Sequence, residues 1–124
     1  MVMDLITMAT SAEITETGVS VAVVPVGSFE QHGAHLPLAT DTIVACAVAS
    51  ALADAYPLAL LPPITLSCSH EHAAWPGTVS ISAATLIAVI ADIRTSLRHA
   101  GTHGLVLVNG HGGNYVLSNF TDRG

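Results

Sequence analysis

Three clusters of histidine and acidic residues, far apart in the chain, have side chains that could carry chemistry. The first cluster contains Glu30, His32 and Asp41, the second is the His-Glu-His run at 70–72, and the third is His111. Carboxylate oxygen and imidazole nitrogen are the ligands of catalytic divalent ions such as zinc or manganese. Glu30 and His32 are two residues apart, so an extended loop points both side chains the same way. A carboxylate at Asp41 could bridge two such ions, an arrangement that activates a water molecule and polarises a carbonyl group.

Each cluster follows a segment that the sequence predicts to be a buried β-strand. Residues 19–26 are almost all valine and alanine, which is typical of a strand buried on both faces of a parallel sheet. Two shorter apolar strands are predicted at 58–61 and 105–108, and helices at 42–56, 83–99 and from Tyr115 onward. Thr40 or Asp41 is the expected N-cap of the first helix, and Ser82 that of the second.

Strands that alternate with helices indicate an α/β fold with a mostly parallel sheet and right-handed crossovers. Loops that follow parallel strands gather outside the carboxyl ends of those strands. We therefore expect the three clusters to meet at one edge of the sheet, although they are distant in sequence.

Every candidate residue also has a simpler interpretation. Asp41 could be a plain helix cap, Glu30 a solvated loop acid, and His32 and His111 loop histidines bonded to the backbone. For His72, substrate contact and structural hydrogen bonding are equally favoured. A structural role is favoured for the remaining polar candidates, which are His35, His70, Glu71, His99 and His103. Trp75 is expected to pack rather than to form a wall of a substrate site.

Composition excludes several classes of protein. A chain of 124 residues, 51% hydrophobic and 10% charged, corresponds to one small domain (1–124) and not to a disordered segment. It has three basic residues and a net charge of −6, which excludes nucleic-acid binding and disfavours anionic membranes. No apolar run reaches the ~20 residues of a membrane span. Residues 1–18 have no basic residue before their apolar stretch, so we expect no secretory signal and a cytoplasmic location.

Two cysteines, Cys46 and Cys68, do not form a disulfide framework, and Cys46 is expected to be a small buried hydrophobe. A domain this small buries only about two-thirds of its unfolded surface, so a chain this apolar would expose too much hydrophobic surface by itself. The composition therefore indicates an obligate oligomer or a part of a longer polypeptide.

Three motifs of this chain together resemble the creatininase family of amidohydrolases. They are PVGSFEQHGAHLPLATD (25–41), SCSHEHAAWPGTVS (67–80) and NGHGGN (109–114), and the resemblance extends over residues 19–119. It implies a three-layer α/β sandwich around a mostly parallel sheet. It also implies hydrolysis of a C–N bond in a small amide, cyclic amide, formamide or modified peptide by a metal-activated water, and assembly as a homo-oligomer, a hexamer by resemblance.

The resemblance also implies a binuclear site for two divalent ions, zinc or manganese. By motif position, Glu30 and His32 would each bind one ion, Asp41 would bridge both, and His111 would complete the site. Glu71 and His72 are the catalytic candidates on the substrate side, and no residue of this chain is assigned as the proton donor for the leaving nitrogen.

This sequence departs from the family pattern in two respects. Creatininase itself has a tyrosine and a metal-binding glutamate after the third-motif histidine, where this chain has Gly112 and Gly113, so one ion lacks a ligand from this motif. The Gly-Gly form resembles the branches that cleave formamides and peptides, which makes creatinine a poor substrate candidate.

The family is also about twice as long as this chain. Its later half carries a His-Ala…Glu segment near the site, and the final NFTDRG breaks off an opening helix. We therefore expect the N-terminal half of the fold, truncated at its C-terminal end. The alternative to an enzyme is a truncated or split non-catalytic chain that acts as an assembly or binding subunit, and a companion chain with the missing half is the partner expected for a split enzyme.

Overall fold

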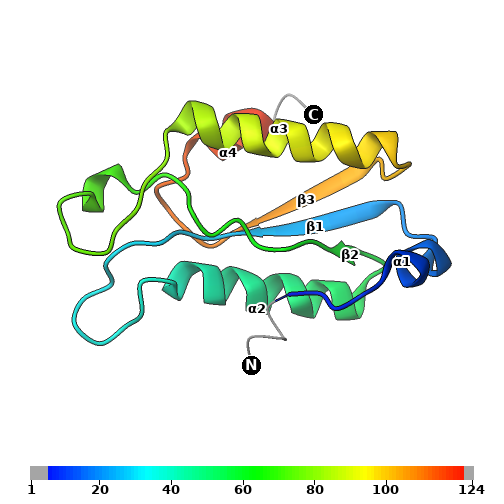
Figure 1. Ribbon diagram of the computed structural model, residues 1–124, viewed down its shortest axis with the longest axis horizontal. Coiled ribbons are helices and arrows are strands. Elements are labelled where there is room, and N and C mark those ends of the chain that lie inside the picture. The colour runs from blue at the N-terminus through cyan, green and yellow to red at the C-terminus, as the bar shows by residue number, and fades with distance from the viewer. Residues whose placement is uncertain (1–5, 122–124) are drawn as a thin grey trace.

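The computed structural model describes residues 6–121, in which a three-stranded parallel sheet lies between helices (Figure 1). The strand order is β2-β1-β3, with both neighbours parallel to the central β1. The strands are β1 (Val21–Val26), β2 (Ala59–Leu60) and β3 (Gly104–Asn109). The helices are α1 (Ser11–Thr17), α2 (Thr40–Ala55), the 3₁₀ helix η2 (His70–His72), α3 (Ala83–His99) and α4 (Val116–Thr121). Residues 1–5 and 122–124 lie outside the described residues. Residues 1–5 belong to the N-terminal segment that is expected not to be a secretory signal.

The layered arrangement confirms the predicted α/β class. Helix α2 covers one face of the sheet, and α3 with α4 covers the other, as Figure 1 shows below and above the strands. The predicted strands and helices are all present, with ends that differ by a few residues from the sequence-based bounds. Residues 65–78, expected to be a loop, contain the short η2 helix. No helix in the described part of the chain has both the length and the apolarity to cross a membrane.

Two apolar layers hold the sheet between the helices. Val24 and Val26 of β1 cluster with Leu86 and Ile90 of α3, and all four are almost fully buried. On the other face, α2 buries the small side chains of Ala45, Cys46 and Ala49. Small residues let a helix axis approach the sheet closely, so the first turn of α2 lies directly against the loop that leaves β1. A Cβ atom at Gly27 would overlap the backbone of Thr42 at that contact. The expectation that Cys46 is buried is confirmed.

The start of α2 differs from the prediction. Its N-cap is Ala39, which makes no side-chain capping bond, while Thr40 and Asp41 lie inside the first turn. The predicted capping role of Thr40 or Asp41 is therefore wrong. The carboxylate of Asp41 bonds to the hydroxyl of Ser28 and to two imidazoles instead of to the free N–H groups of its own helix.

The loops that follow β1 and β3 and the segment with η2 lie at the same end of the sheet, to the left in Figure 1. This end is where the strands present their carboxyl termini. The three clusters of candidate residues belong to these loops, so the topology places them on one side of the molecule, as the order of strands and helices predicted.

Candidate metal centre

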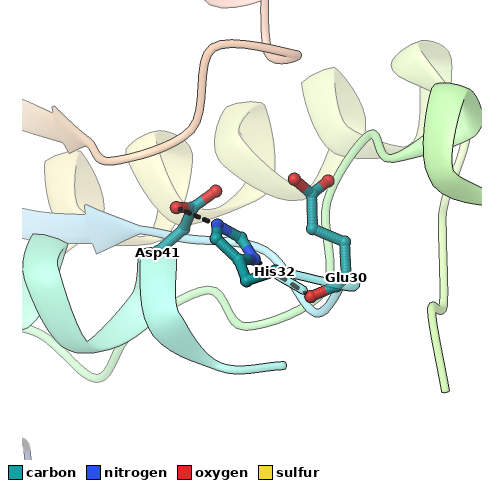
Figure 2. Close-up of side chains that lie close together, drawn as sticks. All are labelled: Glu30, His32 and Asp41. Carbon is teal, nitrogen blue, oxygen red and sulfur yellow. Dashed lines mark hydrogen bonds and ion pairs between the residues drawn. The ribbon is translucent and has the colours of Figure 1, made fainter. Parts of the chain in front are cut away.

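Glu30, His32 and Asp41 come together from the loop after β1 and the first turn of α2 (Figure 2). One ligand atom from each lies within 4.8 Å of those of the other two. His32 Nε2 is 3.1 Å from Asp41 Oδ1, and His32 Nδ1 is 3.1 Å from the backbone carbonyl oxygen of Glu30. Since a carbonyl oxygen can only accept, Nδ1–H donates to it. In the neutral ring, the lone pair of Nε2 then faces the carboxylate of Asp41, and two electron-rich atoms repel each other. A proton or a cation between His32 Nε2 and Asp41 Oδ1 would make this contact favourable.

The pKa of His32 is raised for the same physical reasons. The largest cause is its hydrogen bond to the backbone of Glu30, and the charges of Asp41 and Glu30 add to it, while burial acts in the opposite direction. The environment of the ring therefore favours a positive charge at this position, which a proton or a metal ion can supply.

His111, which follows β3, completes the convergence of residues distant in sequence. Its Nδ1 lies 2.9 Å from Asp41 Oδ2, and its Nε2 lies 3.3 Å from Glu30 Oε1 and 2.7 Å from the carbonyl oxygen of Cys68. These partners are all acceptors, and a neutral imidazole carries a single N–H. One ring nitrogen of a neutral His111 would therefore face oxygen with its lone pair, as His32 does. Asp41 thus lies between two imidazoles and directs one oxygen to each.

The second loop brings Glu71 and His72 to the same place. Glu71 Oε1 is 3.8 Å from His111 Nε2, and Glu30, Glu71 and His111 form a second group with ligand atoms within 4.8 Å of one another. His72 Nε2 lies 3.5 Å from Glu30 Oε2. The structure therefore brings together all six residues that the sequence singled out as metal or catalytic candidates, and both groups contain Glu30.

The donor set fits a divalent cation. Glu30 is almost fully buried, and its Oε1 has no hydrogen-bond donor among the described residues. The site carboxylates form ion pairs with histidines in the described part of the chain. Buried carboxylates need a compensating positive charge. A metal ion bound by carboxylate and imidazole groups would supply that charge with the ligand types that zinc and manganese prefer.

Several residues that position the site were not found from the sequence. Ser28 is fully buried and donates to Asp41 Oδ2 over 2.9 Å. Gln31 accepts the N–H of Gly33 at Oε1, which fixes its amide so that Nε2 donates to His72 Nδ1 over 2.8 Å. Neither residue is marked by spacing or composition, and a serine or glutamine in a loop carries no signal until its partner is known.

The turn that holds His111 did carry a signal. Asn109 donates from Nδ2 to the carbonyl of His111 and accepts the N–H of the same residue, and Asn114 bonds both to Asn109 and to the backbone of Cys68. Asparagines that bond to nearby backbone are characteristic of turns. The two asparagines that begin and end NGHGGN therefore fix the conformation of the turn and connect it to the segment before η2.

The other candidates belong to neither of the two ligand groups found among the described residues. His35, His99 and His103 are exposed. His70 contacts Ser80 and is exposed as well. Trp75 is 55% exposed, so the expectation that it packs is wrong within the described chain.

Comparison with known proteins assigns this architecture to a group of hydrolases. The family model Creatininase, described as creatinine amidohydrolase, matches residues 6–123. The mycofactocin precursor peptide peptidase of Mycolicibacterium smegmatis is 43% identical over 102 residues, which cover 77% of this chain and 41% of that protein. The creatinine amidohydrolase of Pseudomonas putida is 32% identical over 99 residues, which cover 76% of this chain and 38% of that protein.

The fold comparison agrees with the sequence comparison. The solved structure named "Creatininase Mn" superposes with a TM-score of 0.82 at 30% identity and covers 94% of this chain and 49% of its own. The chain thus spans less than half the length of the curated relatives it matches.

Proposed function

The chain belongs to the creatininase family, and from this premise we propose that it is a metal-dependent amidohydrolase or the part of one that carries the metal ligands. The reaction would be hydrolysis of a C–N bond in a small amide, cyclic amide, formamide or modified peptide. The observation that carries the proposal is Asp41, whose two carboxylate oxygens face the imidazoles of His32 and His111.

A peptide is favoured over creatinine as the substrate. The chain is more similar to the precursor peptide peptidase than to creatinine amidohydrolase. A second feature supports this choice, because Gly112 and Gly113 stand where creatininase carries a tyrosine and a glutamate. This Gly-Gly form is the one that resembles the formamide- and peptide-cleaving branches.

Glu30, His32, Asp41 and His111 are the proposed holders of two divalent ions, zinc or manganese. The placement of Asp41 between the two imidazoles supports a bridging role for its carboxylate. Ser28 keeps that carboxylate in place through the bond to Oδ2, so both of its oxygens have fixed directions. Divalent cations held by these residues would lower the pKa of a water molecule and polarise a substrate carbonyl.

Glu71 and His72 are proposed to act on the more open side of the site. The hydrogen bond from Gln31 to Nδ1 of His72 places the ring proton on Nε2, which points toward Glu30. This N–H can donate to the amide group of a substrate that enters beside Glu30. The side chain of Glu71 is 52% exposed and is therefore accessible from the same direction.

A cytoplasmic location and assembly into a homo-oligomer belong to the same proposal. Large apolar side chains that remain exposed, among them Val44, Val48 and Tyr56, support a further contact surface for a second copy or for a companion chain.

Metal analysis of the purified chain tests the proposal. After loading with Zn²⁺ or Mn²⁺ and dialysis, we expect bound metal by mass spectrometry, and hydrolysis of at least one member of a panel of formamides, cyclic amides and short peptides. Asp41→Asn should lose metal and activity together, whereas the exposed Asp54→Asn on the same helix should retain both. A chain that takes up no divalent metal would overturn the proposal. Metal uptake without any hydrolysis would instead support the alternative of a non-catalytic subunit.

A further inference from the structure

Glu71 occupies a position that the metal centre, not the substrate, explains. Its Oε1 is 3.8 Å from Nε2 of His111, the nitrogen that also faces Glu30 Oε1 at 3.3 Å. The ligand atoms of Glu30, Glu71 and His111 lie within 4.8 Å of one another, a spacing compatible with one shared cation. This group is separate from the one that contains His32 and Asp41, and Glu30 is common to both.

The glycine at position 113 leaves the space that Glu71 fills. A Cβ atom built on Gly113 would lie 2.7 Å from Glu71 Oε1, 2.5 Å from His111 Nε2 and 2.9 Å from the carbonyl oxygen of Cys68. Real Cβ atoms do not approach other atoms this closely, so a side chain at 113 would force Glu71, His111 and the backbone at Cys68 to shift. The carboxylate of Glu71 therefore occupies part of the volume beside His111 that a side chain at 113 would need.

A second observation, on Glu30, supports a cation in this volume. Glu30 Oε1, which belongs to this group, is buried and has no hydrogen-bond donor among the described residues. Glu30 as a whole is 4% exposed. A buried carboxylate oxygen without a donor is costly unless a positive ion meets it. Nε2 of His111 lies 3.3 Å from this oxygen but is closer, at 2.7 Å, to the carbonyl oxygen of Cys68, with which it makes its hydrogen bond.

The segment that carries Glu71 is anchored well enough to hold a ligand. The hydroxyl of Ser80 accepts the N–H of Ser69 over 2.8 Å, and the N–H of His72 closes the η2 turn on the carbonyl of Ser69. Ser69 is fully buried. The backbone on both sides of Glu71 is thus fixed, although its carboxylate reaches the surface of the site.

We infer that Glu71 is a metal ligand, which together with Glu30 and His111 holds the second ion, and that it supplies from the second loop the carboxylate that Gly113 does not provide. This inference rests on the proposed function and replaces the expectation that Glu71 acts on the substrate. It leaves His72 as the substrate-side residue of this loop.

The test compares the wild-type chain with Glu71→Gln, which keeps the size of the side chain and removes its charge. The control is Glu16→Gln, an exposed acid on α1. Each protein is stripped of metal and titrated with Co²⁺ alone, with the visible absorption spectrum and the metal content after dialysis as readouts. We expect two equivalents for the wild type and the control. For Glu71→Gln we expect one tight equivalent, with the second weakened by at least about tenfold.

The outcomes separate the two claims. A wild-type chain that binds no Co²⁺ would overturn the proposed function itself. Two tight equivalents in Glu71→Gln, with an unchanged spectrum, would overturn the assignment of Glu71 and leave the proposed function intact. Circular dichroism of the variant, expected to match the wild type, confirms that lost metal does not reflect lost fold.

Discussion

At the scale of single residues, the site depends on which atoms the surrounding backbone leaves free. The carbonyl of Glu30 takes the Nδ1 proton of His32, and the amide of Gln31 occupies Nδ1 of His72. Nδ1 of each ring is thereby held by a hydrogen bond to the loop after β1, and Nε2 faces a carboxylate of the site. Fixing a ligand or donor in advance reduces the entropy that binding must overcome.

Replacing Gly113 by alanine should disturb the second ion and leave the first in place. The new methyl group would meet His111 Nε2 at 2.5 Å, Glu71 Oε1 at 2.7 Å and the carbonyl oxygen of Cys68 at 2.9 Å, so both the His111 ring and the Glu71 carboxylate must shift. We expect Gly113→Ala to lose about one of two Co²⁺ equivalents in the same titration as Glu71→Gln. Gly112→Ala is the matched control, because a Cβ atom there meets no atom within 4 Å. Equal loss in both variants would show that the turn, and not the contact with Glu71, is responsible.

The thiol of Cys46 offers a prediction on pH. Burial against the sheet raises the pKa of Cys46, so the folded chain holds this proton where the unfolded chain releases it. The contribution of the thiol to stability is therefore complete below its ordinary pKa and is lost as the pH rises toward the raised value. We expect alkylation of Cys46 by iodoacetamide at pH 8 to be at least about tenfold slower in the folded chain than in urea. Peptide mapping measures this rate, and equal rates would show that the side chain is not protected.

Much of the site could be predicted at this scale, and its limits are physical. Glu30, His32 and His111 were identified because ligand residue types follow predicted strands. The proposed role of Glu71 could not be derived from sequence, because it depends on the distance between the second loop and the turn at Gly113. Ser28 and Gln31 were missed for the same reason, since their importance lies in one hydrogen bond each.

At the scale of helices and strands, local signals predicted most of the fold. The Ser82 cap and the apolar spacing gave α3 its observed bounds, Ala83–His99. Helix α1 was missed, although Thr10 and Glu13 form a capping box, because the helix buries no residue and lacks an apolar stripe. The N-cap of α2 was predicted wrongly for a different reason. Asp41 is a residue type that suits a cap, but its carboxylate bonds to Ser28, His32 and His111 instead.

The cap of α3 can be tested directly. Ser82 accepts the N–H of Thr85 over 3.1 Å, and α3 packs Leu86 and Ile90 into the core. Ser82→Ala should lower the free energy of unfolding by about 1 kcal/mol, the usual cost of losing such a cap. Urea denaturation followed by circular dichroism measures this value. Thr95→Ala, an exposed change in the same helix, should be neutral or slightly stabilising, and a similar loss there would mean that the effect is not due to capping.

At the scale of the whole molecule, α2 has two apolar faces, of which the sheet covers only one. Ala45, Cys46 and Ala49 are buried against the sheet, whereas the opposite stripe is exposed and contains Ile43, Val44, Ala47, Val48 and Ala51. Val44 and Val48 are 53% and 47% exposed. A helix that is apolar around its circumference is normally buried on all sides, which agrees with the excess of apolar residues in the sequence.

This stripe predicts self-association through α2. In light scattering coupled to size-exclusion chromatography, we expect the purified chain to elute as a multimer. Val44→Glu should shift it toward the monomer, because the charge would be buried without a partner in the contact. Ile14→Glu on α1, also a partly exposed apolar position, is the control and should leave the mass unchanged. A wild-type chain that is monomeric at micromolar concentration would contradict the prediction. The partner for this stripe would then be a companion chain and not a second copy. In that case, adding a protein that carries the remaining family segment should protect the amides of α2 from hydrogen exchange.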